Sequence, residues 1–187
     1  MPFVLRMAFF IIETTTTYMK TEFRKANQKD SPVIWKILKQ AIERRKKDGS
    51  NQWQDGYPNK DVISLDIQKE VGYVLLLENE VVGYSAILIN DEPEYNNIQG
   101  AWITNEGFVV YHRVAIAEEH IGKGLAKELL KHIDEYAIQN NIMSVKADTN
   151  FDNPAMLNLF KKNGYKYCGE VFFRGTPRKA FEKILEV

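Results

Sequence analysis

The residues best suited to chemistry lie in one segment, Tyr111 to Ala126, where an apolar strand pattern gives way to a helix opening on Gly122-Lys123-Gly124. Two glycines this close together allow the backbone to turn tightly and to approach a ligand. The first N–H groups of a helix have no acceptor within it, and with the helix dipole they form a site for an anion. We therefore expect this turn to hold a pyrophosphate. Lys123 either adds a positive charge there or points into solvent.

Two other phosphate-binding patterns are absent from the sequence. A P-loop requires G-x-x-x-x-G-K-[ST], and no such run occurs. A Rossmann fingerprint requires a third small residue, but position 127 is lysine. The Gly-x-Gly pair therefore belongs either to another kind of phosphate site or to a plain tight turn.

A second group of residues, from Asn153 to Tyr165, follows the next expected strand. Together the two segments resemble the signatures of the GNAT (GCN5-related) N-acetyltransferase superfamily. The family motif Q/R-x-x-G-x-G/A is matched from Ile121 to Ala126, with Ile121 replacing the leading Gln or Arg. The second family signature is an asparagine after a strand, then a helix running to a Gly-aromatic pair, and Asn153 to Tyr165 matches it.

The resemblance implies a fold in which two parallel strands separate and acetyl-CoA enters the gap. Here those strands end at Ile116 and Asp148, and the pantetheine arm is expected to pair with the free edge of the first strand. The pyrophosphate is expected on the turn and the helix start. The cofactor residues implied are Val114, Ala115, Ile116, Ile121, Gly122, Lys123, Gly124, Leu125, Ala126, Asn153 and Phe160.

The resemblance also suggests catalytic residues. His112 lies near the acetyl position and is a candidate base because histidine titrates near neutrality, although it is equally compatible with an ordinary strand residue. Asp148 is expected to act as base, to bind a cationic acceptor, or simply to form a hydrogen-bonded turn. The family often places an acidic tyrosine where this sequence has Phe160, so Tyr165 or a water molecule is expected to protonate the leaving thiolate.

The acceptor site is expected in the segments before the cofactor core, which usually shape acceptor specificity in the family. Trp53 and Tyr57 lie in a polar loop, 48–59, and Trp102 lies in another, 91–106. Aromatic rings in polar surroundings can form a ligand platform, and an indole face can hold a protonated amine. The alternative is that these rings cover the core.

The elements that must position these residues follow from hydrophobic periodicity. Helices are expected at 31–47, around Ile63 and Ile67, at 122–139 and at 153–162. Strands are expected at 21–26, 72–77, 81–89, 108–116, 142–148, 165–173 and 179–185. This alternation predicts an α/β fold: a single domain with a mixed central sheet and splayed parallel strands flanked by helices. The first helix closes on Arg44-Arg45-Lys46-Lys47, which we interpret as favourable charge at a helix C-terminus rather than a phosphate patch.

Composition limits the class of protein. The 187 residues include 25 basic and 25 acidic side chains, so nothing favours a nucleic-acid partner. Cys168 is the only cysteine, which fits a reducing cytoplasm, and no histidine pair has helical metal-ligand spacing, so no metal is expected. Residues 1–18 contain an apolar run shorter than the roughly 20 residues that span a bilayer. We interpret them as an extension preceding a domain at 19–187; a weak signal peptide is the alternative.

The resemblance to the GNAT superfamily therefore implies an acetyl-CoA-dependent N-acetyltransferase. It would transfer acetyl to the amine of a small molecule or a protein, by direct attack in a ternary complex. The alternative from another class is a module that binds acetyl-CoA without turnover, which the phenylalanine at position 160 prompts. No membrane partner is expected, and a homodimer is compatible with the sequence.

Overall fold

The structure is a computed structural model that describes residues 20–186. The helices are α1 (Ser31–Lys47), α2 (Lys60–Gln68), α3 (Leu125–Gln139) and α4 (Pro154–Lys162). The strands are β1 (Thr21–Lys25), β2 (Gly72–Leu77), β3 (Glu80–Ile89), β4 (Gln99–Gly100), β5 (Phe108–Ile116), β6 (Ser144–Thr149), β7 (Lys166–Phe173) and β8 (Thr176–Ile184). They form one eight-stranded sheet in the order β1-β2-β3-β5-β6-β8-β7-β4. The predicted mixed α/β fold is confirmed, while the predicted extension, residues 1–18, lies outside the described residues.

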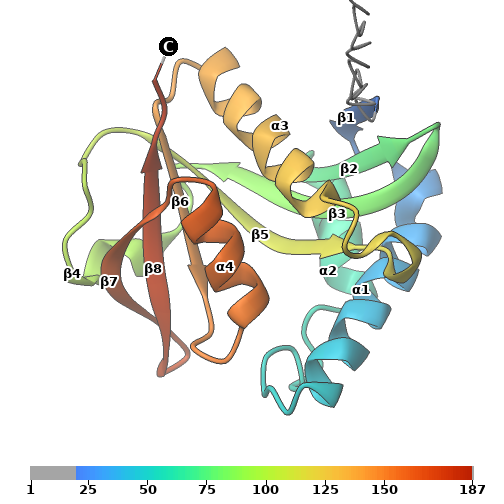
Figure 1. The fold of residues 1–187 in the computed structure, drawn as a ribbon, viewed down its shortest axis with the longest axis horizontal. Helices are drawn as coiled ribbons and strands as arrows, with labels where there is room; N and C mark the ends of the chain where they lie inside the picture. Colours follow the sequence, from blue (N-terminus) through green and yellow to red (C-terminus); the bar gives the residue numbers. More distant parts are fainter. Residues whose placement is uncertain (1–19, 187) are drawn as a thin grey trace, which may run out of the picture.

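Helices cover both faces of the sheet, and the sequence of β2 shows why. Successive strand residues point to opposite faces, so its run of apolar residues buries both. Leu75 packs in the core beneath α3 and α4, whereas Val74 and Leu76 pack in the core beneath α1 and α2. Figure 1 shows α3 and α4 in front of the strands, with α1 at the other side. In the part of the chain that the structure describes, no helix is both long and apolar enough to cross a membrane.

The two halves of the sheet meet along a short parallel seam. Only Phe108–Val110 of β5 pairs with β6, at Ser144–Lys146. Beyond the seam β5 continues beside β3, and β6 continues beside β8. Within residues 20–186, the edge of β5 from position 111 to 116 that faces β6 therefore has no strand partner. The predicted splaying of the parallel strands is confirmed.

A β-bulge bends β5 where this open edge begins. Tyr84 pairs with Ala115 and Ala86 pairs with His112, so two residues of β5 stand opposite Ser85 alone. The hydroxyl of Ser85 donates to the carbonyl of His112 at 3.0 Å, which replaces part of the interrupted ladder.

Arg113, in the bulge, has a backbone φ of 58°. A residue other than glycine adopts this left-handed conformation at a cost of about 1–2 kcal/mol. Its guanidinium is 9% exposed and donates to Asp66 at 2.8 Å. The other oxygen of Asp66 accepts from the hydroxyl of Tyr84 at 2.6 Å. This buried network holds the strained residue in place.

Two predicted boundaries are wrong by three residues, and backbone conformation explains both. The helix α3 begins at Leu125 rather than Gly122, because Gly122 and Gly124 have φ values of 80° and 81°. The last hairpin turns at Arg174-Gly175, both with positive φ, rather than at 175–177. As a result β8 begins earlier than expected and contains Arg178.

The junction between β1 and α1 generates a prediction about acid stability. Asp30 accepts hydrogen bonds from both terminal nitrogens of Arg24, at 2.8 and 3.0 Å, and from the backbone N–H of Asn27 at 2.8 Å. The bond from Arg24 holds the pKa of Asp30 below its usual range, against the opposing effect of burial. Such a carboxylate stabilises the fold above its unfolded pKa of about 3.9 and loses that contribution as the pH falls through the folded pKa.

Asp30→Asn should therefore lower the free energy of unfolding at pH 7 by about 1–3 kcal/mol. The deficit should shrink below about pH 4, where the wild-type carboxyl also becomes protonated. Urea unfolding at pH 7 and at acid pH measures both values, with Asp91→Asn as an exposed control. A deficit that stays constant across this range would contradict the ion pair's role.

Candidate active site

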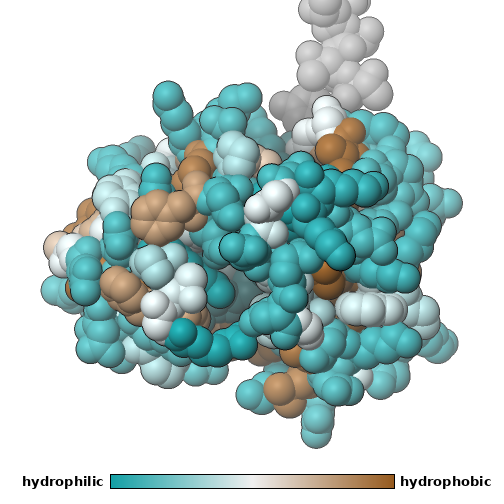
Figure 2. Space-filling model, turned by 90° about the horizontal axis from the view of Figure 1, so that it is seen from below, coloured by the Kyte–Doolittle hydropathy of each residue, from teal (hydrophilic) through white to brown (hydrophobic). Residues whose placement is uncertain are grey.

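A cavity of about 440 Å³ runs along the open edge of β5. One wall is formed by Val114, Ala115 and Ile116 of that edge, and the turn before α3 forms the next. Asn153, at the start of α4, and Arg44 and Arg45, at the end of α1, also line it. Figure 2 shows the underside of the molecule, where a recess opens between two lobes of mainly hydrophilic surface. The volume lies in the range of ligand sites, roughly 300–1,000 Å³.

The turn before α3 presents unpaired donors to this cavity. Within the described residues, the backbone N–H groups of Gly122, Gly124, Leu125 and Ala126 have no hydrogen-bond acceptor. A Cβ built on Gly122 or Gly124 would meet nothing within 4 Å, so both glycines face open space. Lys123 is the exception in the turn, because its side chain does not line the cavity.

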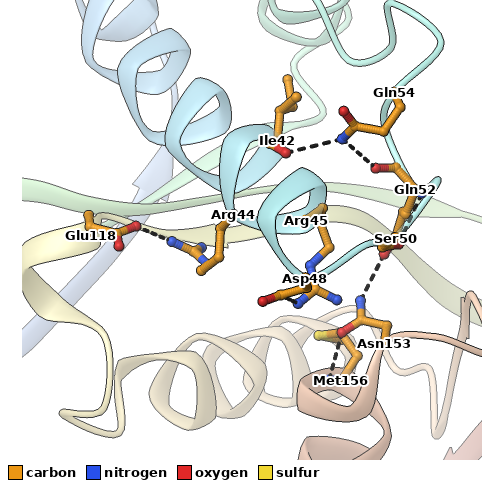
Figure 3. A network of polar contacts seen from close by, with 10 residues as sticks. All are labelled: Ile42, Arg44, Arg45, Asp48, Ser50, Gln52, Gln54, Glu118, Asn153 and Met156. Carbon is orange, nitrogen blue, oxygen red and sulfur yellow. Dashed lines mark hydrogen bonds and ion pairs between the residues drawn. The ribbon is translucent and has the colours of Figure 1, made fainter.

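Asn153 joins the two sides of the cavity. Its Oδ1 accepts from the N–H of Met156 at 3.2 Å and so caps α4, while its Nδ2 donates to Oε1 of Gln52 at 2.9 Å. Figure 3 shows this contact between α4 and the loop that follows α1. The amide pair therefore fixes the loop carrying Trp53 against α4.

A second cavity, of about 70 Å³, adjoins the first. The two share the following lining residues: Gln52, Trp53, Val114, Asn153 and Met156. The second cavity adds Tyr57, Tyr111, His112, Asp148 and Arg178, among others. The second cavity thus brings His112, Asp148 and Arg178 together on the far side of Val114 from the glycine turn.

His112 pairs with the carboxylate of Glu92, which no sequence pattern indicated. Its Nε2 lies 2.6 Å from Oε2 of Glu92, with exposed fractions of 17% and 10% for the two side chains. Burial raises the pKa of Glu92, against the opposing effect of the bond to His112. Glu92 precedes a 3-10 turn at Pro93–Asn97 within a polar loop, where no periodic pattern distinguishes it from its neighbours.

Asp148 is held by two partners from distant segments. Tyr95 donates its hydroxyl to Oδ1 at 2.9 Å, and Arg178 donates to Oδ2 at 3.1 Å. Tyr95 is buried, and burial raises its pKa well above the usual range, so its hydroxyl stays a donor. Asp148 is thus an anchored carboxylate on the wall of the second cavity.

The tyrosine and phenylalanine of the second signature lie in the core. Phe160 is fully buried, with its ring centroid 5.1 Å from that of Tyr165 and 4.8 Å from that of Phe181, and it lines neither cavity. Tyr165 also lines neither cavity. Its ring meets Tyr111 edge-on at 6.4 Å. Tyr111 does line the second cavity, and within the described residues its buried hydroxyl has no hydrogen-bond partner.

The aromatic residues expected at the acceptor site are not all brought together. Trp53 lines both cavities, and Tyr57 lines the second, where its hydroxyl accepts from Arg113. Trp102 lines neither: it covers Lys146, whose Nζ lies 4.5 Å from the ring centroid, and donates to the carbonyl of Tyr95 at 2.9 Å. The structure therefore places Trp102 over the core on the other side of the sheet seam.

Comparisons with known proteins assign the family. The model of the acetyltransferase (GNAT) family matches residues 35–165, which is more than half of the chain, and the protein belongs to this family. No curated protein matches it. A solved GNAT-family acetyltransferase from Streptococcus agalactiae is 32% identical, with a TM-score of 0.83 over 89% of this chain and 96% of that one.

Two more distant structures share the fold. The yncA protein of Salmonella typhimurium, solved with its cofactor acetyl-CoA, is 16% identical, with a TM-score of 0.64 over 90% of this chain and 95% of that one. A ribosomal-protein-alanine N-acetyltransferase from Brucella melitensis is 19% identical, with a TM-score of 0.64 over 88% and 99%. The resemblance inferred from the two sequence signatures is confirmed.

Acetyl-CoA is the cofactor of the GNAT family, and the cavity fits it. The unpaired donors of the glycine turn suit a pyrophosphate, and the unpaired edge of β5 suits the amides of an extended pantetheine arm. Gly122, Gly124, Leu125 and Ala126 would hold the first, and Val114 to Ile116 the second.

The glycine turn generates a binding prediction. Gly124→Glu should abolish the thermal stabilisation by acetyl-CoA, because its carboxylate would occupy the anion space and repel phosphate. Ligand at 100 times its Kd stabilises a native state by about 2.7 kcal/mol, which a melting curve resolves. Gly124→Ala is the matched control, since it imposes similar strain at positive φ without the charge. Normal stabilisation of the Glu variant would place the cofactor elsewhere.

The two tryptophans generate a second prediction. Trp102→Ala should lower the free energy of unfolding by about 2–4 kcal/mol and leave the Kd for acetyl-CoA unchanged. Trp53→Ala should raise that Kd, because Trp53 lines the cofactor cavity. Chemical denaturation and calorimetric titration of both variants measure the two effects. The assignment fails if Trp102→Ala weakens binding and Trp53→Ala does not.

Proposed function

We propose that the protein is an N-acetyltransferase that acetylates an amine of a small molecule or a protein by direct attack in a ternary complex. The observation that carries the proposal is the meeting of the two cavities at Val114. The larger cavity suits the cofactor. The smaller cavity is lined by His112, which pairs with Glu92, and by Asp148. Bound acetyl-CoA supplies the acetyl group as an activated thioester.

The pair of His112 and Glu92 supports removal of a proton from the acceptor. When Glu92 accepts the proton on Nε2 of His112, the lone pair of the imidazole lies on Nδ1. The carboxylate then stabilises the imidazolium that forms when Nδ1 takes a proton, as an aspartate does for a catalytic histidine. His112 is therefore the base of the proposal, with Glu92 as its orienting partner.

Asp148 supports binding of a cationic acceptor. Both of its oxygens already accept hydrogen bonds, from Tyr95 and Arg178, and this fixes the orientation of the carboxylate. The ion pair with Arg178 balances part of its charge, but each carboxylate oxygen keeps a further lone pair for an ammonium group, and such a bond is stronger in a partly buried cavity than in water. We assign Asp148 to acceptor binding rather than to proton transfer.

Tyr111 is proposed as the residue that meets the departing thiolate, in place of Tyr165. Burial raises the pKa of both hydroxyls, so both are protonated at neutral pH. Both hydroxyls lack a hydrogen-bond partner among residues 20–186, and of the two residues only Tyr111 lines the second cavity. A hydroxyl of raised pKa is a weak acid, so we assign Oη of Tyr111 to donate a hydrogen bond to the thiolate rather than to ionise.

An acceptor screen tests the proposed function. Release of free CoA thiol from acetyl-CoA is followed with a panel of primary amines and with peptides bearing a free N-terminus or lysine. Amine-dependent release supports the proposal. Tight binding of acetyl-CoA with no release for any amine would instead favour the module that binds without turnover.

The catalytic pair makes a quantitative prediction. His112→Gln should lower kcat/KM by about 10²–10⁴-fold, the usual contribution of a general base, and leave the Kd for acetyl-CoA unchanged. Glu92→Gln should lower kcat/KM less, and the double variant should be no worse than His112→Gln, because the two residues act as a unit. Exposed Glu106→Gln is the control. Additive losses, or full activity of His112→Gln, would remove the pair from the mechanism.

A further inference from the structure

Basic side chains gather in the lining of the cofactor cavity, although the chain as a whole is neutral. Its lining includes Arg44, Arg45, Lys127 and Lys162, and no aspartate or glutamate among the described residues. The whole chain has equal numbers of basic and acidic residues. The basic side chains come from α1 on one side and from α3 and α4 on the other, so an anion in the cavity meets positive charge from both walls.

The two arginines at the end of α1 form ion pairs with different acidic residues. Arg44 forms an ion pair with Glu118, which lies just before the glycine turn. Arg45 uses Nη2 to pair with Asp48, one turn further along the chain. Figure 3 shows both guanidinium groups beside the cavity, across from Asn153 and the helix α4.

One nitrogen of Arg45 is left without a partner. The side chain is only 12% exposed, and its Nη1 is buried with no hydrogen-bond acceptor in the part of the chain that the structure describes. A buried donor of a charged group that lacks an acceptor costs free energy, so native proteins seldom keep one without a reason. In the free protein Nη1 is closed to solvent, so the guanidinium has to turn toward the adjoining cavity for an anionic ligand there to accept from it.

Charge at the end of a helix does not account for Arg45. Lys46 and Lys47 are exposed and fit the interaction with the dipole of α1 that the sequence predicts. Arg45 instead lines the cavity, as do Gly122 and Gly124 of the glycine turn, whose N–H groups have no acceptor within residues 20–186.

We propose that Arg45 is a further cofactor-binding residue, whose guanidinium turns into the cavity and donates to a phosphate of CoA across from the glycine turn. The phosphate belongs either to the pyrophosphate or to the ribose 3′-phosphate, which present the same chemistry to a guanidinium. The inference rests on the cofactor site and not on the acceptor, so it stands or falls separately from the proposed N-acetyltransferase activity.

Calorimetric titration with CoA tests it without turnover. Arg45→Met keeps the aliphatic stem and removes the charge, and Lys46→Met removes the same charge from the exposed neighbour. Arg45→Met should raise the Kd for CoA by about tenfold or more, as expected for a charge-assisted hydrogen bond, while Lys46→Met leaves it unchanged. The unliganded melting temperature of each variant reports the fold, and Arg45→Gln serves if Arg45→Met fails to fold.

Two truncated ligands identify the phosphate. Dephospho-CoA lacks the 3′-phosphate. If Arg45→Met weakens binding of dephospho-CoA as much as it weakens binding of CoA, Arg45 contacts the pyrophosphate. If wild type and Arg45→Met bind dephospho-CoA equally well, Arg45 contacts the 3′-phosphate. With pantetheine, which has no phosphate, wild type and variant should bind alike. Equal CoA affinity of wild type and Arg45→Met, or an equal loss with pantetheine, would overturn the proposal.

Discussion

Every backbone N–H and C=O group of a strand needs a partner, and along the second half of β5 the edge that faces β6 has none within the described sheet. The strand pairs with β6 over Phe108–Val110 only, and from position 111 onward that edge is open. The cofactor cavity, the second cavity and the glycine turn all adjoin this edge. The N–H and C=O groups of this open edge can pair with a ligand that has amide groups, and acetyl-CoA carries amides in its pantetheine arm.

Holding the two strands apart requires rigid support on both sides. On the β3 side, the bulge at Arg113 is fixed by a buried network that includes Asp66 and Tyr84. On the β6 side, Asp148 is fixed by Tyr95 and Arg178. The contact of Gln52 with Asn153 then joins the loop after α1 to α4. These interactions keep the cavities in place before a ligand arrives, which lowers the cost of ordering the site on binding.

Much of this could be predicted from sequence, because local patterns determined it. The two glycines, the start of α4 at Asn153 and the apolar strands are local signals, and the fold and the region of the cofactor cavity followed from them. The partners of the site residues were not predictable in the same way. Glu92, Tyr95 and Arg178 reach His112 and Asp148 from distant segments, and only the sheet order brings them together.

The errors have the same origin. Trp102 and Trp53 look alike in sequence, as aromatic residues in polar loops, yet one covers Lys146 and the other lines the cavities. Phe160 matches a family position, but the packing of α4 buries it in the core. A side chain's exposure to a cavity depends on tertiary packing, which a single sequence does not display.

Residue-resolved amide hydrogen exchange, with and without saturating CoA, tests whether the glycine turn and the open edge of β5 hold the cofactor. We expect CoA to slow exchange at Gly122, Gly124, Leu125 and Ala126 and along the open edge of β5, whose amides lack partners in the free protein. Amides of β7, remote from the cavity, should be unaffected. Unchanged exchange at the turn and the open edge, in protein that titration shows to be saturated with CoA, would mean that the cofactor binds elsewhere.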